Sequence, residues 1–375
     1  MTPDVLLLAP PVSPEARSMT RYAGELYAAL QALPTWRRSL ALEQPRAARY
    51  LSRAGGDPSL GRFDRAWQRY ITYPRALRSR RAAVFHILDH GYAHLVRSLD
   101  PDRAVITCHD LVPLLASEGV IPMTVSPLLA RTFRWRLAHL SRARAVIAIS
   151  RATASTLQQY TRVRPERIIV VPLGVSSSFR RMPDAASAVR GSAGLPPGTS
   201  IVLQIATGGR YKNTATLLEA FARVRMRVGR ALTLVRVGAP LREDEAALAS
   251  TLGVSAAIHH TGTIDDNTLV GWYNAADVLA FPSLWEGFGW PPLEAMACGT
   301  PVVASDIPAV AEVTGDAGLL VPVADPAALA EALERVLTDP ALAASLGAKG
   351  LERAREYTWA RTASGTAAVY DQILG

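Results

Sequence analysis

The chain has 375 residues, of which 49% are hydrophobic and 19% charged, so it is expected to fold, and its length suits two domains. No apolar run approaches the ~20 residues of a membrane-spanning helix, and the N-terminus lacks the features of a signal peptide. Two cysteines, Cys108 and Cys298, provide no disulfide framework and suit a reducing compartment, which indicates a cytoplasmic protein.

The formal net charge is +9, and most of the excess is concentrated in one stretch. Ten arginines lie between Arg46 and Arg81, against only Asp57 and Asp64. Between Arg62 and Arg81 they alternate with aromatic and aliphatic residues, a mixture that suits binding to anionic lipid headgroups on the inner face of the membrane. A solvated arginine-rich face is the alternative. A nucleic-acid site is a third reading, although no nucleic-acid motif accompanies the charge.

The first half of the chain alternates apolar runs with helical patterns. Strands are expected at residues 5–9, 84–88, 104–107, 145–149 and 168–171, and helices at residues 20–33, 126–142 and 151–160, the last capped by Ser150. This alternation predicts a doubly wound parallel sheet. Residues 172–175 then indicate an interdomain linker, and residues 179–200 are expected to pack loosely because they are rich in Gly, Pro, Ala and Ser.

His109 and Asp110 directly follow the strand expected at residues 104–107. Ligands of doubly wound sheets bind outside the carboxyl ends of the strands, so both side chains are candidate site residues. The spacing of the histidines and aspartates here matches no zinc pattern, so no metal is expected. A Cys108–His109 nucleophilic pair is not expected either, because neighbours on a strand point to opposite faces. A structural loop histidine is the remaining alternative.

A second series of strands and helices begins at residue 201. Strands are expected at residues 201–206, 231–237, 258–261, 278–281 and 319–321, with helices at residues 215–227, 266–275, 326–337 and 359–374. Between the first strand and helix lies the sequence T-G-G-R-Y-K-N, residues 207–213. Glycines followed by Arg210 and Lys212 ahead of a helix favour the binding of an anion, with a solvated basic turn as the alternative.

The most informative stretch is P-S-L-W-E-G-F-G-W-P-P-L-E-A-M-A-C-G-T-P-V-V-A-S-D, residues 282–306. It predicts a glycine loop after a strand, then a helix that Gly299 ends, then a strand. Gly287 and Gly289 permit close approach of a ligand to the backbone. Pro291 and Pro292 suit the first turn of the helix, whose free N–H groups would favour an anion.

Two carboxylates, Glu286 and Glu294, flank this anion site. A carboxylate accepts hydrogen bonds from hydroxyl groups, so the ligand is expected to combine hydroxyls with phosphate. A nucleotide-sugar has this composition, with hydroxyls at both ends and a diphosphate between them.

The spacing E-x7-E from Glu286 to Glu294, with G-F-G between and A-x-x-C-G-T-P-V-V after, resembles the retaining nucleotide-sugar-dependent glycosyltransferases of family 4. The resemblance implies the α/β GT-B fold, in which two Rossmann-like doubly wound domains face each other across a cleft. It further implies an acceptor domain at residues 1–175, a nucleotide-sugar domain at residues 176–357, and a C-terminal helix at residues 358–375 that crosses back to the first domain.

The resemblance also implies roles for individual residues. Glu286 would bind the hydroxyls of the sugar ring and Glu294 those of the ribose. Lys212 would bind the diphosphate with Arg210, although Tyr211 stands where the family usually has its arginine. The remaining donor-binding positions are Gly287, Phe288, Gly289, Pro292 and Leu293, and the run H-D-L-V-P places His109 and Asp110 near the transferred sugar and the acceptor. No metal or other cofactor is implied, because cations and the helix start would neutralise the departing diphosphate.

The expected activity is therefore retaining transfer of a hexose to a glycan or lipid-linked acceptor, as in the synthesis of cell-surface polysaccharide. The runs H-I-L-D-H-G-Y-A-H-L and C-H-D-L resemble mannosyltransferases and favour GDP-mannose, while UDP-sugars stay open. A nucleotide-sugar epimerase of the same fold and a non-catalytic nucleotide-sugar or membrane-surface binding module are the alternatives.

Overall fold

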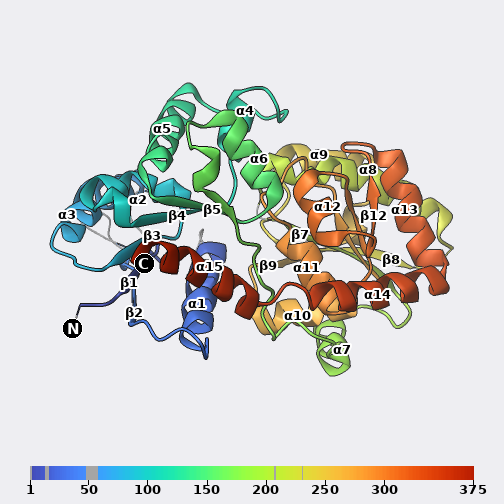
Figure 1. Ribbon diagram of the computed structural model, residues 1–375. Coiled ribbons are helices and arrows are strands. Elements are labelled where there is room, and N and C mark those ends of the chain that lie inside the picture. Colours follow the sequence, from blue (N-terminus) through green and yellow to red (C-terminus); the bar gives the residue numbers. More distant parts are fainter. Residues whose placement is uncertain (1, 13–16, 48–57, 207, 230) are drawn as a thin grey trace. The chain divides into compact units, whose positions relative to one another are not determined.

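The computed structural model describes the whole chain except residues 1, 13–16, 48–57, 207 and 230 (Figure 1). Arg49, Arg53 and Asp57 of the basic stretch, and Thr207 of the glycine-rich turn, therefore lie outside the described residues. The chain forms two compact units. Unit 1 comprises Met1–Ser117, Thr124–Gly174 and Trp359–Gly375, and unit 2 comprises Glu118–Met123 and Val175–Thr358.

Unit 1 is built on a parallel sheet whose described strands have the order β2-β1-β3-β4-β5-β6. Four of them are buried along their whole length, and a sheet covered on both faces needs such continuous apolar runs. The edge strand β2 is half-buried and was not predicted. The strands are β1 (Val5–Leu8), β2 (Leu40–Glu43), β3 (Val84–Ile87), β4 (Ala104–Cys108), β5 (Ala145–Ala148) and β6 (Ile168–Val170).

Helices cover the sheet of unit 1, and one of them comes from the C-terminus of the chain. The predicted cap of α6 is confirmed, since Ser150 Oγ accepts a hydrogen bond from the backbone N–H of Thr153 at 2.9 Å. The helical elements are α1 (Arg17–Gln31), α2 (Pro58–Trp67), the π-helical turn η2 (Gln68–Thr72), α3 (Tyr73–Leu77), η3 (His90–Ser98), η4 (Pro101–Arg103), α4 (Val112–Ser117), α5 (Pro127–Leu137), η5 (Leu140–Arg142), α6 (Arg151–Tyr160), η6 (Pro165–Arg167) and α15 (Trp359–Leu374).

Unit 2 contains a second parallel sheet, with the described strands in the order β12-β11-β10-β7-β8-β9. The long strands β7 and β8 lie side by side and are almost entirely buried. The strand β10, from which the glycine loop departs, is flanked by β7 and β11 and lies inside the sheet. The strands are β7 (Ser200–Ala206), β8 (Leu232–Gly238), β9 (Ile258–Gly262), β10 (Val278–Phe281), β11 (Val302–Ser305) and β12 (Gly318–Val321).

The helices of unit 2 include one that contradicts the sequence analysis. The expectation of loose packing at residues 179–200 is wrong, because residues 183–192 form α7, which packs against α10. The two helices come so close that a Cβ on Gly271 would lie 2.6 Å from Val189 Cγ1. The helices are α7 (Pro183–Ser192), η7 (Arg210–Lys212), α8 (Thr214–Arg227), α9 (Glu243–Thr251), η8 (Ser255–Ala257), α10 (Asp266–Ala275), α11 (Trp290–Ala297), α12 (Pro308–Thr314), α13 (Pro326–Thr338) and α14 (Pro340–Ala354).

Candidate functional site

The glycine loop of unit 2 has the predicted local structure: it connects β10 to α11, and β11 follows the helix. Gly289 precedes the helix with φ 121°, a conformation that residues with a Cβ rarely adopt. Gly299 ends it in the left-handed region with φ 77°, as predicted. Gly287, Phe288 and Gly289 are all buried, and the Phe288 ring packs edge-on against Tyr357.

The start of α11 differs from the expectation in one respect. We expected free N–H groups here, but Pro291 and Pro292 have none, and the N–H of Leu293 donates to Gly289 O at 3.2 Å. Pro292 and Leu293 are buried, so they shape the loop through packing. The N–H groups of residues 291–293 are therefore not available to an anion, and a side-chain cation is needed beside them.

Lys212 supplies such a cation, and it contacts one of the two predicted glutamates. Its Nζ lies 2.6 Å from Glu286 Oε1, and the two side chains are only 9% and 14% exposed. The ammonium group also lies about 5 Å from the ring centroids of Tyr211 and Phe281. The backbone of the two loops is joined as well, because the N–H of Leu284 donates to Tyr211 O at 2.7 Å. The structure thus brings together two candidate residues that are 74 positions apart in the chain.

Two buried polar atoms close in sequence to this ion pair lack a hydrogen-bond partner among the described residues. They are Ser283 Oγ, two residues after β10, and Asn213 Nδ2, one residue after Lys212. Asn213 has φ 52°, a left-handed conformation that this residue tolerates better than most. Buried polar groups are almost always hydrogen-bonded, so these two atoms are suited to a polar ligand.

Glu294, the second predicted glutamate, is 3% exposed on α11. Its Oε2 accepts a hydrogen bond from the hydroxyl of Tyr273 on α10 at 2.7 Å. A buried carboxylate needs such donors, since unpaired it would be strongly disfavoured. Tyr273 was not recognised in the sequence, because its role depends on the packing of α10 against α11.

Arg210 is less constrained than Lys212. Its guanidinium pairs with Asp244 of α9 at 2.8 Å, and the side chains are 62% and 49% exposed. Hydrogen bonds from Arg242 and then Arg210 lower the pKa of Asp244 below its ordinary value. The structure places Arg210 and Lys212 at opposite ends of the same helical turn, η7.

Arg236 on β8 is a further polar residue that the sequence analysis missed. It is 1% exposed, and its guanidinium donates to Gln204 Oε1 and, at 3.0 Å each, to Thr214 Oγ1 and the carbonyl of Ala239. Burial lowers its pKa, and the nearby carboxylate of Glu245 opposes that shift. Arg236 therefore fixes both the start of α8, next to Lys212, and the loop after β8.

The two candidate residues of unit 1 lie directly after β4. His109 is 5% exposed, and its Nε2 lies 2.8 Å from the carbonyl oxygen of Leu88. Burial lowers the pKa of His109, so the ring is neutral near pH 7. Because a carbonyl only accepts, Nε2 carries the proton and Nδ1 keeps its lone pair. Asp110 Oδ1 accepts from the N–H of Val112 and so begins α4.

Behind His109 lies a buried chain of hydrogen bonds. His86 Nε2 is 2.7 Å from Thr107 Oγ1, which is 3.0 Å from the hydroxyl of Tyr22. The other ring nitrogen, Nδ1, is 2.5 Å from the hydroxyl of Tyr370 on α15. The Tyr22 ring in turn packs edge-on against His109 at 4.7 Å. Burial, with a smaller contribution from His109, lowers the pKa of His86 to about 3. His86 is therefore the neutral histidine within this series of hydrogen bonds.

Cys108, the neighbour of His109, is fully buried, and burial raises the pKa of its thiol well above the ordinary value. Such a thiol is unsuited to nucleophilic chemistry. Within the described ranges, no group of three or more His, Cys, Asp or Glu side chains is arranged to bind a metal ion. None of the described helices is long and apolar enough to cross a bilayer.

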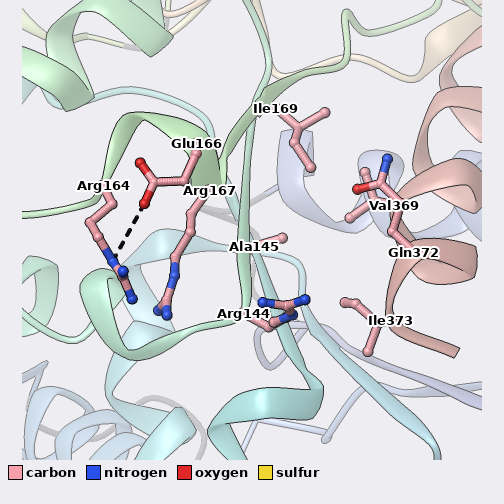
Figure 2. A pocket seen from close by; sticks show the side chains of 9 residues that line it. All are labelled: Arg144, Ala145, Arg164, Glu166, Arg167, Ile169, Val369, Gln372 and Ile373. Atoms are coloured by element: carbon pink, nitrogen blue, oxygen red, sulfur yellow. Dashed lines mark ion pairs between the residues drawn. The ribbon is translucent and has the colours of Figure 1, made fainter. Parts of the chain in front are cut away.

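A pocket of about 290 Å³ in unit 1 lies away from the predicted residues. Figure 2 shows Arg164, Glu166 and Arg167 on one side of it, the residues of α15 on the other, and Arg144 between them. It opens where β5 and β6 begin, whereas ligands of doubly wound sheets bind where the strands end. We therefore do not assign the donor to it. Its lining residues are Arg144, Ala145, Arg164, Glu166, Arg167, Ile169, Val369, Gln372 and Ile373.

Two family descriptions match the chain, one in each half. Residues 187–353 match "Glycosyl transferases group 1", and residues 19–179 match "Glycosyltransferase Family 4". The chain belongs to the group 1 glycosyltransferases. The family prediction made from Glu286, Glu294 and the intervening glycines is thereby confirmed.

Two curated relatives illustrate the range of activities within this family. Serotype-specific mannosyltransferase WbdA from Escherichia coli is 30% identical over 270 residues, which cover 70% of this chain and 32% of WbdA. D-inositol 3-phosphate glycosyltransferase from Streptomyces bingchenggensis is 35% identical over 240 residues, covering 61% of this chain and 53% of that protein. The chain thus spans only about a third to a half of the length of these relatives.

Solved structures with the same fold cover essentially the whole chain. Sucrose-phosphate synthase from Thermosynechococcus elongatus has a TM-score of 0.76 at 24% identity, covering 100% of this chain and 99% of that chain. Anabaena Alr3699/HepE in complex with UDP and glucose has a TM-score of 0.73 at 19% identity, covering 98% of this chain and 99% of that chain. The predicted fold, GT-B with two Rossmann-like doubly wound domains, is confirmed.

Proposed function

We propose that this glycosyltransferase moves a hexose from a nucleotide-diphosphate sugar to an acceptor hydroxyl with retention of the anomeric configuration. The observation that supports the proposal most is the contact between Lys212 and Glu286 at the glycine loop, with Nζ and Oε1 2.6 Å apart. It combines a cation for phosphate with a carboxylate for hydroxyls in one place, and both side chains are largely shielded from water.

In this proposal the bound donor separates Lys212 from Glu286, and each side chain then contacts a different part of the donor. Lys212 would transfer its hydrogen bond to the diphosphate, and Glu286 would then accept from the hydroxyls of the sugar ring. A cation shielded from water interacts more strongly with developing charge than an exposed one, so Lys212 would contribute most as the diphosphate departs. Arg210, which is 62% exposed, would supply a weaker, more adaptable contact.

Glu294 would bind the ribose of the donor. The hydroxyl of Tyr273 donates to Oε2 of this carboxylate and so holds Glu294 in place for that contact. Gly287, Phe288 and Gly289 would form the wall of the donor site. Gly289 has its unusual backbone conformation there, and Phe288 is held by Tyr357.

The chemical step would proceed on one face of the sugar. The bond between the anomeric carbon and the diphosphate oxygen would break, and the acceptor oxygen would bond to the same face of that carbon. The acceptor proton would pass to the departing phosphate oxygen. Lys212 neutralises charge on the phosphate, so we propose that no divalent metal is needed for the step.

His109 and Asp110 would contribute from unit 1. The neutral ring of His109 has a lone pair at Nδ1, because Nε2 donates to Leu88 O. It is therefore suited to accept a hydrogen bond from a hydroxyl of the sugar or the acceptor. Asp110 is tied through Oδ1 to the backbone of Val112, which would position its other oxygen.

We propose mannose from GDP-mannose as the donor, and a glycan or lipid-linked acceptor of cell-surface polysaccharide synthesis. The names of two relatives support mannose, WbdA and the "MMP alpha-(1->4)-mannosyltransferase" of Mycolicibacterium hassiacum, 34% identical over 234 residues. The alternative is a UDP-sugar, which the Anabaena Alr3699/HepE complex with UDP-glucose favours. A thermal-shift comparison of GDP-, UDP- and dTDP-sugars separates these donors.

The test of catalysis is release of nucleotide from the donor identified in that comparison, with and without acceptor glycans. Glu286→Ala should reduce kcat by at least about a hundredfold, as loss of a group that acts in the transition state does. Glu294→Ala should mainly weaken donor binding. Glu331→Ala, at an exposed position of α13, is the control and should behave as the wild type. Undiminished turnover by Glu286→Ala would refute the assignment.

A further inference from the structure

A basic and aromatic surface on unit 1 has no role in the proposed reaction. Large apolar side chains are rarely exposed on this protein: the described residues include eleven, and six of them lie on α2, η2 and α5. These six include every exposed aromatic side chain of the described residues. They are Phe63, Trp67, Tyr70, Leu128, Leu129 and Trp135.

The six side chains belong to one surface, although they come from distant parts of the sequence. Phe63 and Trp67 stack with their ring centroids 6.0 Å apart. Tyr70 packs edge-on against Trp135 of α5, also at 6.0 Å, which joins the two helical segments. The most exposed member is Leu128 at the start of α5, at 68%. We call α2, η2 and α5 with these side chains the aromatic surface.

The segments that carry the aromatic surface contain almost no acidic residues. Between residues 58 and 88 the only acidic residue is Asp64, which is 1% exposed, and residues 121–165 contain none. Arg69 donates a hydrogen bond to the hydroxyl of Tyr92, and Arg80 forms an ion pair with Glu43. These two arginines therefore already have partners within the protein. The exposed arginines of these segments include Arg62, Arg65, Arg75, Arg78 and Arg131.

We propose that the aromatic surface binds an anionic lipid bilayer. Aromatic rings and leucines would enter the headgroup region, and the surrounding arginines would pair with lipid phosphates. A solvated arginine-rich face needs no cluster of exposed apolar side chains, whereas an interaction surface does. Residues 62–81 were the stretch predicted to bind lipid, and the structure adds α5 through the contact of Tyr70 with Trp135. The proposal goes beyond the transfer reaction and does not depend on it.

The experiment is cosedimentation of the full chain with vesicles. Vesicles of equal parts phosphatidylglycerol and phosphatidylcholine are compared with vesicles of phosphatidylcholine alone. We expect binding to the anionic vesicles at low salt and a marked loss near 1 M salt, where the screening length falls to about 3 Å. A soluble polyphosphate and a single-stranded RNA are tested as competitors.

A pair of double variants locates the binding surface. Arg65→Gln/Trp67→Ser removes one arginine and one aromatic ring from α2. Arg225→Gln/Met226→Ser is the matched control on α8 in unit 2, where Met226 is 81% exposed. The α2 variant should bind anionic vesicles at least tenfold more weakly. Loss of one arginine near such a surface should lower the affinity about fivefold, and loss of the buried apolar area of the ring should lower it further. The control should bind as the wild type.

Leu128→Ser tests the contribution of α5 independently, and it should weaken binding without lowering Tm because the side chain is exposed. The proposal is overturned if the wild type ignores anionic vesicles at low salt, or if the control on α8 loses as much binding as the α2 variant. It is also overturned if the chain binds polyphosphate or RNA but not vesicles, which would identify a nucleic-acid or polyanion surface.

Discussion

The ion pair between Lys212 and Glu286 allows a quantitative prediction about stability. The two charged atoms lie 2.6 Å apart, and the side chains are 9% and 14% exposed, so water screens the interaction only weakly. Removal of one partner from such a pair costs about 3–5 kcal/mol when burial is complete. Since this pair keeps some contact with water, we expect about 3 kcal/mol for Lys212→Met. That corresponds to a decrease in Tm of roughly 6–12 °C for a domain of this size.

The assay is a double-mutant cycle on thermal unfolding with Lys212→Met, Glu286→Gln and the double variant. The two changes should be strongly non-additive, with a coupling of about 2 kcal/mol. The control cycle uses Arg227→Met and Glu334→Gln, a pair at 3.0 Å whose side chains are 53% and 31% exposed. Its coupling should stay below about 1 kcal/mol. Equal coupling in the two cycles would refute the reasoning that burial strengthens the first pair.

Three further predictions concern buried polar groups. Tyr273→Phe removes the donor to buried Glu294 and should destabilise the protein by about 1–3 kcal/mol in urea unfolding, with weaker binding of nucleotide. Arg236→Met removes the donor that binds Gln204, Thr214 and the carbonyl of Ala239, and it should cost about 1–3 kcal/mol, which unchanged stability in urea unfolding would contradict. His86 has a folded pKa of about 3, below the ~6.5 of the unfolded chain, so stability should fall as pH drops below ~6.5. Between pH 7 and 5 this amounts to about 2 kcal/mol, and His86→Phe should reduce the difference by that amount.

Local signals in the sequence were sufficient for the glycine loop. Gly289 and Gly299 take backbone conformations that favour glycine, and both bracket α11 as expected. The buried strands were recognisable from uninterrupted apolar runs, because both faces of a parallel sheet are covered. The half-buried edge strand β2 lacks such a run and escaped detection.

Features that depend on long-range packing could not be predicted in the same way. Tyr273 and Glu294 are 21 positions apart, and His86 and Tyr370 are 284 apart, so no local pattern connects them. Arg236 reads as an isolated charge within an apolar strand until β7 and β8 are paired. The N–H groups expected at the start of α11 are a different case, because two prolines and a bond within the loop remove them.

A crystal structure with bound nucleotide diphosphate would locate the donor site. We expect a phosphate oxygen within hydrogen-bonding distance of Lys212 Nζ, and a ribose hydroxyl that donates to the carboxylate of Glu294. A nucleotide bound away from the loop between β10 and α11, with Lys212 still held by Glu286, would refute the proposed donor site.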